Sequence, residues 1–346
     1  MDMLLLEEDS CIDDLRPFTS TRSVLDMRMG IFTLREKWEL MLGKGAFELV
    51  GRDTPGALPA NILPTPELIA AIAGVGKGVI DKVGETGARI IRYPWDIFRY
   101  NAEALITDFA IIARRGTSEP IPPSVQAINP EKIFIEKGAR IQHCLLNAST
   151  GPIYIGRNAE IMEGSLIRGP FAACEGSTVK MGTKIYGATT LGPYCAAGGE
   201  IKNVVFFGYS SKGHDGYLGD AVIGEWCNLG AGTSASNLKN NAGDIKVWHP
   251  ASGQTISAGQ KCGLLMGDYS RSAINTAFNT GTVVGVCCSV FGEAPPPKYV
   301  PNFSWGTGHR YEWDKALRDI DNWKKLKNQS LTDAEILTLK HIFGIL

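Results

Sequence analysis

The sequence predicts a mainly β fold whose largest part is a parallel β-solenoid of hexapeptide repeats, flanked by a small N-terminal α/β segment and a C-terminal helical tail. Two observations favour the solenoid: small aliphatic residues recur at every sixth position, and a small side chain stands four residues after most of them. The sixfold spacing holds at Ile155, Ile161, Ile167, Ala173, Val179, Ile185, Leu191 and Ala197. Six residues form one short strand and a corner, so eighteen residues complete a triangular coil.

The residues between these aliphatic positions support the same repeat. The small fourth residue is found at Ala159, Ser165, Ser177, Thr183, Thr189 and Cys195. A second run of the same period, with one polar member, stands at Met266, Ser272, Phe278, Val284 and Val290. Aliphatic-glycine pairs such as Leu191 and Gly192 suit tight corners, where a Cβ would clash. The repeats themselves therefore extend over about residues 130 to 293.

Three regions are expected along the chain. Residues 1–115 form the α/β segment, because helical spacing appears around Trp38 and again after Pro66, and residues 93–115 read as a helix that joins this segment to the solenoid. Residues 116–293 form the solenoid. Residues 294–346 form a proline-rich connector and two helices, the second opened by a capping box from Thr332 to Glu335. Such a tail can cover the open end of a solenoid.

Composition and charge narrow the class of protein. The formal net charge of −1 argues against a broad nucleic-acid-binding surface. The first ten residues are acidic with a short apolar run, unlike a signal peptide, and no apolar stretch approaches the roughly 20 residues of a membrane span. A cytoplasmic protein without a membrane partner is therefore predicted. The eight cysteines include no C-x-x-C pair, so they are interpreted as reduced core residues.

The segment from Gly208 to Asp220 interrupts the repeat, and excursions of this kind commonly carry function. It contains His214, one of five histidines in the chain, and Tyr217 three residues later. The residues that follow supply Asn228 and Asn237. Histidine is the side chain best suited to accept a proton near neutral pH. The pattern favours His214 as a general base, although an exposed loop histidine without a role is also compatible with it.

A family resemblance accompanies this segment. The stretch HDGYLGDAVIGEWCNLGAGTSASN resembles the acetyltransferase half of the bacterial bifunctional enzyme that makes UDP-N-acetylglucosamine, a left-handed parallel β-helix. The whole chain is similar to a variant branch of that UDP-N-acetylglucosamine diphosphorylase/glucosamine-1-phosphate N-acetyltransferase family, described as sugar nucleotidyltransferases. The shared stretches are LRPFTSTRSVLDMRMGIFTLREKW, YPWDIF, NPEKIFIEKGARI, LNASTGPIYIG, GYSSKGHDGYLGD, NLKNN, FNTGTVVG and VPNFSWG.

The resemblance implies acetyl transfer from acetyl-CoA to an amino-sugar phosphate, in a homotrimer whose sites lie between neighbouring prisms. It gives His214 the role of general base and assigns the sugar and phosphate to Tyr217, Asn228 and Asn237. Lys202 stands where the family has a phosphate-binding lysine. Lys184 precedes it by eighteen residues, which predicts that the two ammonium groups stack on adjacent strands of one face.

One lysine of the family's acetyltransferase pattern is missing from its usual place. The family has a lysine shortly after its second asparagine, and Gly243 occupies that position here. Lys239 or Lys246 are the candidates to replace it.

The N-terminal segment departs further from the family's nucleotidyltransferase pattern. Arg16, Thr19, Thr21 and Arg22 match part of the nucleotide-binding stretch, but Val24 stands near the position of the family's lysine. No glycine-rich loop precedes them, and 115 residues are too few for a complete nucleotide-binding domain. Nucleotidyl transfer is therefore uncertain, and Mg²⁺ is implied only if that reaction survives.

Two other classes of protein stay open. A non-catalytic trimeric scaffold, or a binder of sugar nucleotides, would keep the fold without the chemistry. A zinc-dependent β-helix enzyme would need three convergent histidines, whereas only His143 and His214 fall within the coils, so no metal site is expected.

Overall fold

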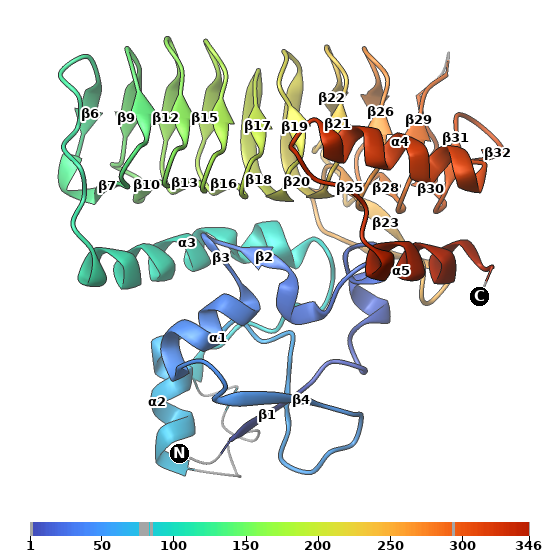
Figure 1. The fold of residues 1–346 in the computed structure, drawn as a ribbon, viewed down its shortest axis with the longest axis horizontal. Coiled ribbons are helices and arrows are strands. Elements are labelled where there is room, and N and C mark those ends of the chain that lie inside the picture. The colour runs from blue at the N-terminus through green and yellow to red at the C-terminus, as the bar shows by residue number, and fades with distance from the viewer. Residues whose placement is uncertain (1–2, 76–82, 84–85, 293–294, 346) are drawn as a thin grey trace.

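The computed structural model describes residues 3–75, 83, 86–292 and 295–345. A long parallel β-solenoid runs along one side of the molecule, and the N-terminal segment packs beneath it (Figure 1). The mainly β fold, the small α/β segment and the helical tail are therefore confirmed. The division at residues 115 and 293 stays a prediction, while strand pairing of the solenoid continues into residues 299–305.

The solenoid has three faces of short parallel strands. The face that packs on the N-terminal segment, the covered face, contains β7 (Ile133–Ile135), β10 (Ile153–Ile155), β13 (Phe171–Ala173), β16 (Thr189–Leu191), the ends of β18 (Glu200–Gly208) and β20 (Tyr217–Glu225), β25 (Leu265–Met266), β28 (Val283–Val284) and β30 (Tyr299–Val300). The second face contains β8 (Arg140–Ile141), β11 (Glu160–Ile161), β14 (Thr178–Val179), β17 (Ala196–Ala197), β19 (Ser211–Lys212), β21 (Asn228–Leu229), β26 (Arg271–Ser272), β29 (Ser289–Val290) and β31 (Ser304–Trp305), and ends at the antiparallel β32 (His309–Arg310). The open face contains β6 (Gln126–Ile128), β9 (Leu145–Asn147), β12 (Leu166–Arg168), β15 (Lys184–Tyr186), the starts of β18 and β20, β22 (Ser234–Ala235) and β27 (Ala277–Phe278).

The interior of the solenoid confirms both sequence patterns. All eight members of the first sixfold run and all five of the second, Ser272 included, are buried in the prism. The small residues at the fourth positions are buried as well, and those with hydroxyl groups bond to corner carbonyls: Ser177 Oγ donates to the carbonyl of Cys174 over 2.7 Å. A corner can therefore bury a polar side chain because its hydroxyl satisfies the chain's own backbone.

All eight cysteines are buried and free. Burial raises the pKa of the Cys174 thiol to about 11, which favours the unreactive thiol form. The interpretation of the cysteines as core residues is confirmed, and their reduced state stays a prediction.

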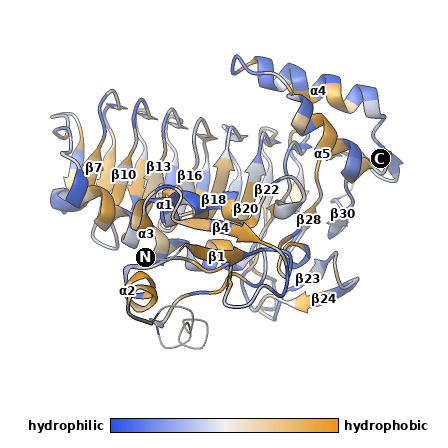
Figure 2. Cartoon of the chain, turned by 60° about the horizontal axis from the view of Figure 1, so that its bottom comes forward, coloured by the Kyte–Doolittle hydropathy of each residue, from blue (hydrophilic) through white to orange (hydrophobic). Residues whose placement is uncertain are grey.

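The N-terminal segment is built on a three-stranded parallel sheet in the order β4-β1-β5. Its strands are β1 (Leu4–Glu7), β4 (Phe47–Val50) and β5 (Leu58–Pro59), and a short hairpin consists of β2 (Arg28–Met29) and β3 (Phe32–Thr33). Its helices are α1 (Leu34–Leu42), α2 (Pro66–Val75) and the short η1 (Asp13–Leu15), η2 (Phe18–Ser20) and η3 (Val24–Asp26). Hydrophobic residues concentrate on β1 and β4, between α2 and the solenoid (Figure 2).

Helix α3 (Asp96–Arg115) joins the two parts, as the sequence predicts. It runs beneath the covered face (Figure 1), where its Leu105 packs with Phe134 and Tyr154. Its Asp108 is fully buried and pairs with Lys37 of α1, and the same carboxylate accepts the backbone N–H of Ile31 over 2.8 Å. Breaking such a buried pair leaves an uncompensated charge, so this contact fixes α1 and the β2–β3 hairpin to α3.

The C-terminal tail consists of α4 (Trp313–Lys325) and α5 (Asp333–Phe343), and the predicted capping box of Thr332 and Glu335 is present. The helices do not lie across the end of the solenoid. They pack along one of its corners, where they form an apolar cluster with Trp226, Tyr269 and Phe303. Aromatic side chains at this corner offer α4 a long apolar strip, which explains its direction along the axis (Figure 1).

Residues 237–262 leave the solenoid between β22 and β25 and form a hairpin of β23 (Lys246–His249) and β24 (Gln254–Ser257). Ile245 and Val247 join the hydrophobic core shared by the N-terminal segment and the covered face. Within the described ranges of the chain, no helix is both long and apolar enough to cross a membrane.

Candidate functional site

His214 lies on the corner loop between β19 and β20, where its side chain is exposed. Glycine shapes this loop for a steric reason. Gly216 has φ of 120°, and a Cβ there would come within 2.1 Å of the carbonyl oxygen of Thr233 in the next coil. The loop is therefore held tightly at its base, while the imidazole projects into solvent.

Lys212 lies beneath the His214 loop and is fully buried. Its register partner in the preceding coil is Ala197, so it occupies an interior position that aliphatic residues fill elsewhere. Its Nζ donates to the backbone carbonyls of His214 over 2.7 Å and Asp215 over 3.2 Å. Burial lowers the pKa of Lys212 to about 8, since a charged ammonium is costly inside the prism. Lys212 thus fixes the backbone of the loop that presents His214.

Lys212 is not among the site residues that the sequence pattern predicts, although one signal points to it. The sixfold register is lost after Ala197, so the interior position of this lysine could not be counted from the preceding coils. Its placement two residues before His214, in a loop bounded by glycines, was the remaining clue.

Tyr217 begins β20, and the residues after it explain the motif Y-L-G-D. Leu218 points into the prism, and Gly219 leaves room for the tyrosine ring, since a Cβ there would lie 2.2 Å from the tyrosine hydroxyl oxygen. Asp220 turns the corner with φ of 45° and accepts hydrogen bonds from Asn203 Nδ2, over 2.7 Å, and from Asn237 Nδ2. The motif therefore encodes one outward ring and one buried corner carboxylate.

Tyr217 and Asn237 are brought together at this corner. Partial burial is the first cause that raises the pKa of Tyr217, followed by the charges of Asp220 and Glu200, while a hydrogen bond with Asn237 acts in the opposite direction. The tyrosine therefore stays a neutral phenol that can donate or accept a hydrogen bond.

Asn228 lies on a different face. It is half-buried in β21, with Ser211 and Arg271 as its register neighbours on the second face. The corner loop with His214 separates it from Tyr217. Within the described part of the chain, no hydrogen bond or ion pair joins the His214 imidazole to Tyr217, Asn228 or Asn237, so one chain gathers only two of these four residues.

The predicted stacking of Lys184 and Lys202 is wrong. Lys184 pairs with Glu200, and Lys202 pairs with Tyr186, so the two ammonium groups are offset by two residues along the strands. The cause is the corner at Gly198 and Gly199, which brings the chain from Ala197 to Ile201 in four residues instead of six. Both lysines nevertheless belong to the open face, where Lys184 is exposed and Lys202 is half-buried.

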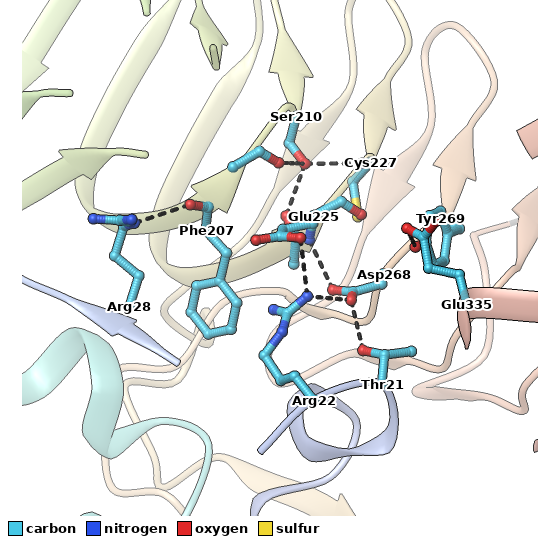
Figure 3. A network of polar contacts seen from close by, with 12 residues as sticks. Thr21, Arg22, Arg28, Phe207, Ser210, Glu225, Cys227, Asp268, Tyr269 and Glu335 are labelled. Atoms are coloured by element: carbon cyan, nitrogen blue, oxygen red, sulfur yellow. Dashed lines mark hydrogen bonds and ion pairs between the residues drawn. The ribbon is translucent and has the colours of Figure 1, made fainter. Parts of the chain in front are cut away.

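The candidate nucleotide-binding residues make structural contacts, although Thr21 also lines a small pocket of about 170 Å³ beside Tyr269 and α5. Thr19 is buried and donates to the carbonyl of Ile12 over 2.5 Å, while Arg16 pairs with Asp13 at the surface. Thr21 donates to Asp268 Oδ2 over 2.6 Å, across the boundary between the N-terminal segment and the solenoid (Figure 3).

Arg22 completes that contact across the boundary. Its guanidinium pairs with Asp268 and lies 3.4 Å from the carboxylate of Glu225 (Figure 3). Burial acts to lower the pKa of Arg22, but the two carboxylates outweigh it and raise the pKa above its ordinary value. The guanidinium also lies over the ring of Phe207, 5.0 Å from its centroid. A nucleotide at Thr21 and Arg22 would have to displace these contacts.

No group of three or more His, Cys, Asp or Glu side chains is placed to hold a metal ion in the ranges that the structure describes.

The sequence matches one family model and is similar, over part of its length, to bifunctional proteins. Residues 3–54 match the model of the sugar nucleotidyl transferase family. The chain is 34% identical over 96 residues to a bifunctional sugar-1-phosphate nucleotidylyltransferase/acetyltransferase of Sulfurisphaera tokodaii, covering 28% of this chain and 23% of that protein. It is 32% identical over 89 residues to the bifunctional protein GlmU of Methanocaldococcus jannaschii, covering 26% and 21%.

Longer but weaker similarities are also present. GlmU of Nostoc is 29% identical over 154 residues, or 38% of this chain and 34% of that protein. The chain thus spans between a fifth and about a third of these relatives. A solved UDP-N-acetylglucosamine acyltransferase of Arabidopsis is 14% identical, covers 65% of this chain and 92% of its own, and has a TM-score of 0.20, which carries no weight for function.

Taken with the fold, these similarities describe a β-solenoid protein whose sequence resembles bifunctional nucleotidylyltransferase/acetyltransferases and whose first 54 residues contain a sugar nucleotidyl transferase match.

Proposed function

We propose that the protein transfers an acetyl group from acetyl-CoA to the amine of an amino-sugar phosphate of the glucosamine 1-phosphate type. The observation that carries the proposal is the exposed imidazole of His214, on a loop whose backbone Lys212 fixes, three residues before Tyr217, which lies with Asn237. The similarity to bifunctional nucleotidylyltransferase/acetyltransferases supports the reaction class.

In this reaction the sugar nitrogen attacks the thioester carbonyl carbon. His214 accepts the proton that the amine loses as the C–N bond forms, the C–S bond then breaks, and coenzyme A leaves as a thiol after taking up a proton. Tyr217 and Asn237 contribute hydrogen bonds to the sugar. Asn228, Lys184 and Lys202 lie on faces that a second copy can approach, so their roles depend on assembly into a trimer.

The test is an assay of free thiol with acetyl-CoA and glucosamine 1-phosphate. His214→Ala is expected to lower the rate by about 10² to 10⁴-fold, the usual range for loss of a general base. Because the side chain is exposed, the free energy of unfolding should change by less than about 1 kcal/mol. His309→Ala, another exposed histidine, is the matched control and should keep the parental rate. An unchanged rate for His214→Ala would remove this residue from the mechanism.

We further propose that residues 1–115 do not transfer nucleotides by themselves. Thr21 and Arg22 are engaged with Asp268, and Val24 stands near the position of the family's lysine. No UDP-sugar should form from UTP, Mg²⁺ and a sugar phosphate, measured by chromatography. Formation above a control without Mg²⁺ contradicts this proposal and would return Arg16, Thr19, Thr21 and Arg22 to a nucleotide site.

A second candidate function is a non-catalytic scaffold or sugar-nucleotide binder. The observation that favours it is the use of Thr21 and Arg22 as a structural contact, since it shows that the N-terminal segment is fixed on the solenoid. Tight binding of a sugar nucleotide without thiol release by the parental protein would select this candidate.

A further inference from the structure

Two sequence stretches that the proposed reaction leaves largely unused meet in a surface pocket of about 420 Å³. The stretch NLKNN, residues 237–241, follows β22, and the stretch FNTG, residues 278–281, ends β27 and continues beyond it. Because β22 and β27 pair through Ser234 with Ala277 and Ala235 with Phe278, the chain leaves both strands side by side. The pocket is lined by Ser236, Leu238, Lys239, Asn240, Asn241, Asn279, Thr280 and Lys298.

Two lysines reach this pocket from different parts of the chain. Lys239 belongs to residues 237–262, which leave the solenoid, and its Nζ donates to the backbone carbonyl of Asp244. Lys298 precedes β30, and its own carbonyl accepts the N–H of Val283 over 2.8 Å, which fixes its backbone. Partial burial is the first cause that lowers the pKa of Lys298, and the positive charge of Lys239 is the second. Two ammonium groups that repel each other in one pocket favour an anion between them.

The amides of the pocket also offer donors. Asn279 Oδ1 accepts the backbone N–H of Thr280 over 2.8 Å and its hydroxyl over 3.4 Å. Asn241 Oδ1 accepts the N–H of Gly243 over 3.1 Å. Since the oxygen of each amide is used within its own loop, the NH₂ group is what each presents to a ligand. A pocket with two cations and two amide donors matches a ligand that carries several anionic oxygens.

We infer that this pocket binds a phosphate monoester through Lys239 and Lys298. The same chemistry is present in an amino-sugar 1-phosphate and in the 3′-phosphate of coenzyme A. The choice of these two ligands rests on the acetyl transfer proposed above, whereas the phosphate site does not. The pocket also distinguishes between Lys239 and Lys246, the two candidates to replace the family's missing lysine. Lys239 lines the pocket, whereas Lys246 lies in the β23–β24 hairpin and pairs with Ser257.

The experiment is calorimetric titration of the full chain with two matched ligand pairs. Glucosamine 1-phosphate is compared with glucosamine, and coenzyme A with dephospho-coenzyme A, which lacks the 3′-phosphate. Lys239→Gln and Lys298→Gln are each expected to weaken binding of one phosphorylated ligand by about tenfold or more, as for loss of a charge-assisted hydrogen bond. The unphosphorylated partner should bind the variants and the parent alike, and Lys246→Gln is the control that should leave both affinities unchanged.

The ligand pair whose phosphorylated member binds the lysine variants more weakly identifies the source of the phosphate. The inference is overturned if neither phosphorylated ligand binds better than its partner at millimolar concentration, or if both lysine variants keep the parental affinity. Thiol release with an unchanged KM for both substrates in Lys298→Gln would reject the site and keep the acetyl transfer. Loss of phosphate binding in that variant, with no thiol release by the parent, would keep the site and reject the acetyl transfer.

Discussion

Single residues that break the repeat define the proposed site. Most interior positions of the solenoid hold aliphatic side chains, yet Lys212 stands opposite Ala197 and reaches the carbonyls of His214 and Asp215. A buried lysine costs free energy, so its presence at the base of the loop is best explained by what it fixes.

The burial of Lys212 predicts how the free energy of unfolding depends on pH. Its folded-state pKa of about 8 lies below the ordinary 10.5, so between these values the unfolded chain holds more protons than the folded chain. The contribution of this lysine to the free energy of unfolding therefore rises with pH across that window, by at most about 3 kcal/mol.

Lys212→Met should accordingly match or exceed the parent in stability at pH 7 and lose that advantage between pH 8 and pH 10.5, measured by urea unfolding at each pH. The same variant should release thiol more slowly at every pH, because the His214 loop loses its buried anchor. Stability curves that run parallel from pH 7 to pH 10.5 would argue against a depressed pKa.

Elements are placed by a few buried contacts that join distant parts of the chain. Arg22 from the loop before η3 meets Asp268 and Glu225 of the solenoid, and Lys37 of α1 meets Asp108 of α3. The N-terminal segment is thus fixed by charge pairs as well as by the apolar cluster that β1 and β4 share with the covered face.

Removal of Arg22 tests this docking. Arg22→Leu removes the guanidinium over the ring of Phe207 and leaves the carboxylates of Asp268 and Glu225 without their partner, so the free energy of unfolding should fall by about 3 to 5 kcal/mol. Arg16→Leu removes an exposed pair with Asp13 and should cost no more than about 1 kcal/mol. Denaturant unfolding followed by circular dichroism measures both, and equal losses in the two variants would contradict a docking role.

At the scale of the whole molecule, the N-terminal segment packs beneath the covered face, and α4 and α5 pack along the corner that carries Trp226 and Phe303 (Figure 1). The open face lies away from both. It exposes Ile128, Leu166 and Tyr186 on three of its strands. Flat strand faces with apolar side chains are suited to self-association. A homotrimer packed through this face is therefore the assembly we predict.

Sedimentation at micromolar concentration checks the assembly. The parental chain should sediment as a trimer, and Leu166→Glu should shift it toward the monomer, because three carboxylates would be buried at the threefold contact. Leu337→Glu, which changes an equally exposed leucine on α5, should remain a trimer. A monomeric parent would contradict the prediction and would leave Asn228 and Tyr217 on separate faces with no second copy to join them.

The sequence by itself determined the solenoid, because a sixfold aliphatic spacing has one way to bury its side chains, and every residue of both runs from Ile155 to Val290 is inside the prism. It also located the loop of His214, since that loop breaks the spacing. Only the tertiary structure decided which residues from different coils and segments are neighbours. Gly198 and Gly199 shorten one corner by two residues, which offsets Lys184 from Lys202. One further residue is lost between Ile201 and Phe206, and the two changes together place Lys212 inside. The contact of Arg22 with Asp268 and the meeting of Lys239 with Lys298 join residues far apart in the chain, and periodicity carries no information about such contacts.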